Sequence, residues 1–161
     1  MADGPGVRCK LVLIGARADA TADRQIAGRN LVLLIDVSGS MTSADRLPML
    51  RSALVLFVDS LGPEDKVSIV TYAGTSGVAL PTTPARQRAV IQRAIGQLEA
   101  GGSTNGAAGI ETAYRMARQA FVRGGVNRVI LATDGDFNVG VTGEDELLKI
   151  IEREKASGIF L

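Results

Sequence analysis

The run LVLLIDV at residues 31–37 is apolar on both faces of any strand that it forms. Such a strand has to be buried on both faces of the sheet. A strand with one solvent-exposed face would instead alternate apolar and polar residues. Residues 66–73 and 127–134 are two further candidate strands, and the second of them also has the pattern of a buried strand. Segments with apolar residues at helical spacing lie between or after these strands, at residues 43–62, 85–98, 105–121 and 142–158. The alternation predicts an α/β fold: a doubly wound, mostly parallel sheet with helices on both faces.

The helix expected over residues 43–62 carries start and stop signals. Ser43 is a candidate N-terminal cap, and Pro48 suits the first turn because its missing N–H needs no partner there. Gly62, followed by a proline, ends the helix. The segment is therefore an amphipathic helix that packs against the sheet.

Three segments are expected at the margins of the sheet. Residues 77–84 form a short strand that Pro81 confines to an edge or a bulge, because proline donates no hydrogen bond to a neighbouring strand. Residues 7–20 alternate loosely and are expected to be an edge strand or part of a preceding segment. The last residues, IFL at 159–161, have the pattern of a further buried strand that is just beginning. We expect the domain to be shortened at its C-terminal end.

The length of 161 residues and the 46% hydrophobic content suit one domain that needs neither disulfides nor a structural metal to build its core. We divide the chain into an N-terminal lead-in over residues 1–29 and one domain over residues 30–161. Cys9 is the single cysteine and forms no internal disulfide. No signal-peptide core or apolar run long enough to span a membrane occurs. As written the chain is compatible with the cytoplasm, and its compartment is otherwise unknown.

Two further properties of the composition exclude classes of function. The 18 lysines and arginines balance 17 acids without a dense basic block, which argues against nucleic-acid binding. The chain has no histidine. Serine–histidine and cysteine–histidine nucleophilic sites and histidine-rich zinc sites are therefore impossible.

A carboxylate and two hydroxyls follow the first buried strand at alternating positions: Asp36, Ser38 and Ser40. Ligands of open α/β sheets bind outside the carboxyl ends of the strands, and Gly39 permits a tight turn at this end. Hard oxygen ligands of this kind suit Mg²⁺, which takes about six oxygens and usually keeps several waters. The spacing therefore predicts part of a magnesium site.

Two other loops supply further oxygens, with Thr104 in GGSTNG and Asp134 directly after the apolar residues of the strand at 127–134. Ser103 is an alternative to Thr104, and Asp136 an alternative to Asp134. Taken singly, each loop is equally well explained by helix caps and turns, in which Ser, Thr and Asp are common. Together the loops predict one metal site with the ligands Asp36, Ser38, Ser40, Thr104 and Asp134.

The stretches NLVLLIDVSGSM, GGSTNGAAGI and VNRVILATDGDFNVG together resemble bacterial von Willebrand factor type A proteins, and the five residues resemble that family's metal-ion-dependent adhesion site. The resemblance covers residues 30–161. It implies a Rossmann-like fold and a bound Mg²⁺ or Mn²⁺, with Ca²⁺ suiting the set less well. By the same implication Ser38, Ser40 and Thr104 approach the cation directly, and the two aspartates bind it directly or through water.

The resemblance also implies a function and a longer domain. An acidic side chain of a partner protein takes the open coordination position, so the domain is a binding module and not an enzyme. A full domain of this family continues through another helix and strand beyond Ile159.

Two other functions compete with this interpretation. A magnesium-dependent phosphoryl-transfer enzyme is suggested by an aspartate at a strand end, but the DxDxT of haloacid dehalogenase-like phosphatases has its second aspartate where this chain has Ser38. No Walker-type nucleotide motif occurs. The third function is assembly, because an unpaired sheet edge at the C-terminal end invites pairing with a second copy of the chain.

Overall fold

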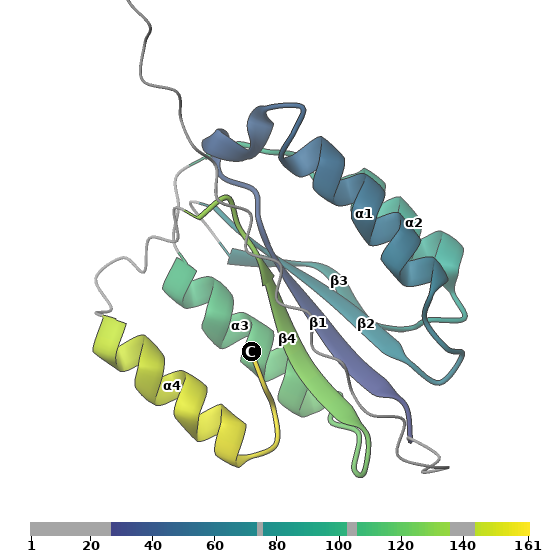
Figure 1. The fold of residues 1–161 in the computed structure, drawn as a ribbon, viewed down its shortest axis with the longest axis vertical. Helices are drawn as coiled ribbons and strands as arrows, with labels where there is room; N and C mark the ends of the chain where they lie inside the picture. Colours follow the sequence, from purple (N-terminus) through teal and green to yellow (C-terminus); the bar gives the residue numbers. More distant parts are fainter. Residues whose placement is uncertain (1–26, 74–75, 103–105, 136–143) are drawn as a thin grey trace, which may run out of the picture.

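A computed structural model describes residues 27–73, 76–102, 106–135 and 144–161. Its sheet has four strands in the order β3–β2–β1–β4. β1 is parallel to both of its neighbours, and β3 is antiparallel to β2 at one edge (Figure 1). The strands are β1 Arg29–Asp36, β2 Lys66–Tyr72, β3 Ser76–Pro84 and β4 Val126–Ala132. The mostly parallel sheet and the antiparallel edge strand that contains Pro81 confirm the sequence-based predictions.

Helices cover both faces of the sheet, as Figure 1 shows. One face carries α1 Leu47–Asp59 and α2 Arg88–Gly96. The other face carries α3 Gly106–Gln119 and α4 Glu144–Ala156. A short 3-10 helix, η1 Gly39–Thr42, connects the end of β1 to α1. This is the predicted doubly wound α/β arrangement.

β1 contributes to both layers of the core through its alternating side chains. Leu31, Leu33 and Ile35 pack in the cluster with α1 and α2. Val32 and Leu34 pack in the cluster with α3, and all five side chains are at most 4% exposed. Each buried side chain of this size contributes about 1.5–3 kcal/mol. The strand that ends at the predicted metal loop is therefore the best anchored strand of the sheet.

Two expectations from the sequence differ from the structure. β4 is not covered on both faces, because Arg128 and Ile130 are exposed while Val129 is buried. β4 is the last strand in the order β3–β2–β1–β4. The apolar cluster under α1 and α2 contains none of the described residues of β4. Ser43 does not cap α1: its hydroxyl donates to Asp45 at 2.6 Å, and the helix begins after Arg46.

The C-terminal residues lie beside β4. Gly158 has a φ of +90°, a conformation that glycine adopts at no steric cost, and the chain turns there after α4. Ile159 is 1% exposed, and Phe160 forms a parallel bridge to Arg128 of β4. This pairing agrees with the expected start of a further buried strand. The expected edge strand at residues 7–20 lies outside the described residues.

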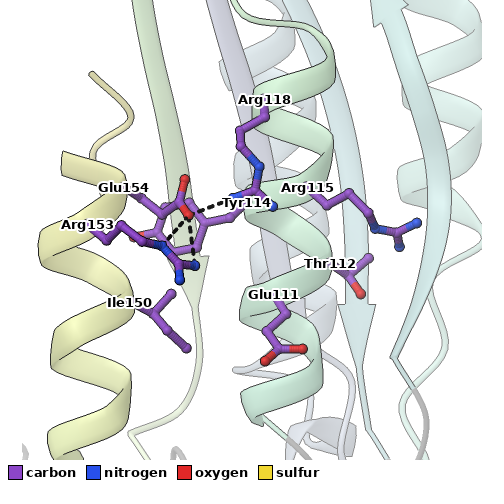
Figure 2. Close-up of a pocket in the computed structure, with 8 residues that line it drawn as sticks. All are labelled: Glu111, Thr112, Tyr114, Arg115, Arg118, Ile150, Arg153 and Glu154. Atoms are coloured by element: carbon purple, nitrogen blue, oxygen red, sulfur yellow. Dashed lines mark hydrogen bonds and ion pairs between the residues drawn. The ribbon is translucent and has the colours of Figure 1, made fainter. Parts of the chain in front are cut away.

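A buried carboxylate joins α4 to α3. Glu154 on α4 is 3% exposed and accepts hydrogen bonds from Arg118 at 2.6 Å and from Arg153 at 3.1 Å, at the side of a hollow of about 410 Å³ (Figure 2). Tyr114 lies in the same place, and burial and the charge of Glu154 raise its pKa to about 12. The ion pair joins two helices of one layer, and its residues include none of the predicted metal ligands.

A second buried carboxylate, Asp65, stabilises the end of the sheet opposite the predicted metal loop. Asp65 accepts hydrogen bonds from the backbone N–H of Arg29 at 2.8 Å, from Nη2 of Arg29 at 2.6 Å and from the N–H of Gly62 at 2.8 Å. Burial opposes ionisation of this carboxyl, but the hydrogen bonds outweigh burial and lower its pKa below the usual range. The charged form is therefore the one that the fold stabilises.

Asp65→Asn is expected to lower the free energy of unfolding by about 1–2 kcal/mol at pH 7. Because the pKa is lowered in the folded state, the stabilisation is complete above the unfolded pKa of about 3.9 and is lost as the pH falls through the folded value. Urea unfolding at pH 7 and pH 3 measures the effect, and Glu64→Gln is the control because Glu64 is exposed. Equal losses at both pH values would show that the charge of Asp65 is not responsible.

Candidate metal centre

Asp36 ends β1 as a fully buried carboxylate with three hydrogen-bond donors around it. The backbone N–H of Ser38 donates to Oδ1 at 2.8 Å. The hydroxyls of Tyr72 and Thr133 donate to Oδ2 at 3.0 and 3.1 Å. These three bonds compensate for burial of the charge and fix the orientation of the carboxylate.

Tyr72 and Thr133 are members of the site that the sequence analysis did not identify. Tyr72 pairs directly with Asp36 in the parallel register of β1 and β2, and Thr133 immediately follows β4. Both residues thus lie at the carboxyl ends of strands that flank β1, which is the signal that could have identified them. Burial, together with the nearby charge of Asp36, raises the pKa of Tyr72 well above its usual range. The phenol therefore remains a proton donor at neutral pH.

Ser38 and Ser40 bring two hydroxyls together directly beyond Asp36. Their Oγ atoms are 3.0 Å apart, and Ser38 is buried while Ser40 is exposed. Ser38 precedes η1, and this 3-10 turn brings Ser40 back beside it. The alternating positions of Asp36, Ser38 and Ser40 in the sequence therefore place their oxygens together at the end of β1.

The loop that precedes Thr104 is attached to the same turn. The N–H of Gly39 donates to the carbonyl of Gly102 at 3.2 Å, and the N–H of Gly101 donates to the carbonyl of Val37 at 2.7 Å. Thr104 and its alternative Ser103 lie outside the described residues, as does Asp136. The described part of the chain thus joins two of the three predicted ligand loops through backbone hydrogen bonds.

Asp134 lies in the third loop, two residues beyond the end of β4. Its Oδ2 accepts a hydrogen bond of 2.5 Å from Nη1 of Arg46. The same nitrogen donates to the backbone carbonyl of Ser40 at 2.7 Å. Arg46 thereby joins the loop after β1 to the loop after β4.

The chemistry of the donors fits a hard divalent cation. Within the described ranges no three His, Cys, Asp or Glu side chains form a group that could hold a metal, and a cation bound here would need serine hydroxyls and water as further ligands. Two aspartates match the charge of one divalent ion, and hydroxyls and water are ligands that Mg²⁺ accepts. Asp36 keeps little free lone-pair capacity, which suits a bond to a metal-bound water.

A sheet of this topology, with an oxygen-rich site at the carboxyl ends of its central strands, defines the class of α/β domains that bind ligands at this edge. The family model for the von Willebrand factor type A domain matches residues 31–137. The chain belongs to this family, whose members are generally protein-interaction modules.

Two sequence relatives illustrate the relationship. YfbK of Escherichia coli strain K12, an uncharacterized protein, is 44% identical over 151 residues, which are 94% of this chain and 26% of YfbK. The magnesium-chelatase 60 kDa subunit of Rhodobacter capsulatus is 31% identical over 144 residues, which are 84% of this chain and 25% of that subunit. The chain thus spans about a quarter of the length of these two relatives.

A solved structure shows the same fold. The von Willebrand factor type A protein from Catenulispora acidiphila superposes with a TM-score of 0.67 at 24% identity, over 83% of this chain and 32% of that chain.

The described helices of the present chain include none that is both long and apolar enough to cross a membrane.

Proposed function

We propose that this domain binds a divalent cation, Mg²⁺ or Mn²⁺, and uses it to capture an acidic side chain of a partner protein. Ser38, Ser40 and Thr104 would hold the cation directly, with Asp36 and Asp134 bound directly or through water. When bound, the cation supplies a positive charge with an open coordination position, which attracts a carboxylate.

The observation that supports the proposal best is the organisation of Asp36. A fully buried carboxylate costs stability unless it is compensated, and this one receives three hydrogen bonds, two of them from hydroxyls. Such networks orient metal ligands from outside the coordination sphere. The family membership adds a second argument, because related domains generally act by binding other proteins. The relative named as a magnesium-chelatase subunit is likewise part of a larger assembly.

The alternative of a phosphoryl-transfer enzyme receives less support. An aspartate that attacks a phosphoryl group has to present a free carboxylate oxygen to the substrate. Asp36 is fully buried, and its Oδ2 accepts bonds from both Tyr72 and Thr133. Its environment favours a positioning role over a nucleophilic one.

Selection from a displayed library of constrained peptides tests the proposal. In Mg²⁺ or Mn²⁺ the immobilised domain is expected to enrich peptides with a central Asp or Glu. Chelation and Asp134→Ala are both expected to abolish the enrichment, because the carboxylate binds through the cation.

Glu146→Gln is the matched control, since it removes a carboxylate on the exposed side of α4. Enriched peptides without an acidic residue, or binding that persists in chelator, would contradict the proposed mechanism of capture.

A further inference from the structure

One side-chain nitrogen of Arg46 contacts two of the ligand loops at the candidate centre. Nη1 lies 2.7 Å from the carbonyl oxygen of Ser40 and 2.5 Å from Oδ2 of Asp134. The side chain of Asp134 is 9% exposed, whereas that of Arg46 is 42% exposed. A permanent positive charge is therefore held between the loop after β1 and the loop after β4.

From this geometry we infer that Arg46 is a tethered internal cation that competes with the divalent ion for Asp134. The inference rests on the proposed function and concerns the regulation of that same site. The hydrogen bond of 2.5 Å between the guanidinium of Arg46 and Oδ2 of Asp134 is short and charge-assisted, so it is a strong interaction of this oxygen. A divalent ion that takes this oxygen must displace Arg46, and one that binds nearby is repelled by its charge.

The displacement is energetically feasible. Ion pairs with an exposed partner contribute little net stability, because water compensates the charges when they separate. Arg46 precedes α1 and its guanidinium is partly in solvent, so the side chain has room to move away without disturbing the core. Arg46 thus sets a threshold: the centre loads only when the concentration of divalent ion is high enough to replace it.

Calorimetric titration with Mn²⁺ tests the inference on wild type, Arg46→Gln, Arg46→Lys and Arg51→Gln. Arg46→Gln keeps a hydrogen-bond donor but removes the charge, and is expected to lower the Kd for Mn²⁺ about fivefold to thirtyfold. Arg46→Lys keeps the charge but not the planar guanidinium, and its Kd is expected to lie closer to that of wild type than the Kd of Arg46→Gln does. The gain in Arg46→Gln is expected to shrink at high salt, which screens the repulsion.

Arg51→Gln is the matched control. Arg51 lies on α1 and its hydrogen bonds go to the carbonyls of Leu98 and Gly96, not to a described candidate ligand, so its removal should leave the Kd unchanged. If wild type binds Mn²⁺ and Arg46→Gln binds it equally well or more weakly, the competition is overturned while the proposed function stands. Absence of Mn²⁺ binding in wild type and in Arg46→Gln would overturn the proposed function, and the competition with it.

Discussion

Millimolar Mg²⁺ or Mn²⁺ is expected to raise the unfolding temperature of this domain by about 5–10 °C over its value in chelator. A ligand that binds only the folded state stabilises it by RT ln(1 + [L]/Kd), which is about 2.7 kcal/mol at a hundredfold excess over Kd. For a domain of this size each kcal/mol corresponds to about 2–4 °C. Thermal unfolding followed by circular dichroism measures the shift.

The increment should vanish in Asp134→Ala, and this comparison is the informative one. Asp134 is paired with Arg46, so the variant changes the baseline stability as well. The quantity to compare is therefore the difference between metal and chelator within each variant. An equal increment in wild type and Asp134→Ala would mean that the cation binds elsewhere on the chain.

Gly109→Val is expected to destabilise the fold by about 3 kcal/mol. A Cβ atom on Gly109 of α3 would lie 2.8 Å from Cβ of Tyr72 and 3.2 Å from Cδ1 of Leu34. Neither neighbour can give way easily, because both are buried at 0% exposure in β1 and β2. The helix has to move away from the sheet, and urea unfolding measures the cost.

Gly96→Val is the matched control for this substitution. Gly96 is also a helical glycine, at the end of α2, and nothing lies within 4 Å of its Cβ position. We expect a change within about 0.5 kcal/mol there. Comparable losses at the two positions would show that the contact with Tyr72 and Leu34 is not the cause, because valine is a better helix former than glycine. Since the hydroxyl of Tyr72 donates to Asp36, Gly109→Val should also reduce the stabilisation by metal.

The sequence predicts the architecture well where the pattern is local. Residues 31–37 are apolar on both faces because helices cover both sides of β1, and the position of Asp36 at the strand end follows from the same run. Arg128 is a local signal of the exposed face of β4, but the apolar Ile130 on the same face is not. Its exposure depends on the order of strands in the sheet, which no single segment of the chain encodes.

The candidate site divides in the same way. Asp36, Ser38 and Ser40 are visible because their spacing is local. Tyr72 and Thr133 are not, because a tyrosine and a threonine in strands have the appearance of ordinary core and surface residues. Arg46 precedes a helix and looks like a solvated charge, and its contact with Asp134 arises only when η1 turns the chain back. The role of Thr104 and the domain boundary at residue 30 stay predictions.

The two hydroxyls on Oδ2 of Asp36 come from very different distances along the chain, 36 residues for Tyr72 and 97 residues for Thr133. The first bond is available once β1 and β2 have paired, whereas the second has to wait for β4. Closing the longer loop costs more chain entropy, so we expect β4 to pair with β1 later than β2 does. A chain emerging from the ribosome would therefore contain the serine turn early and complete the carboxylate network late. If the proposed cation binds, its binding would thus report that β4 has joined the sheet.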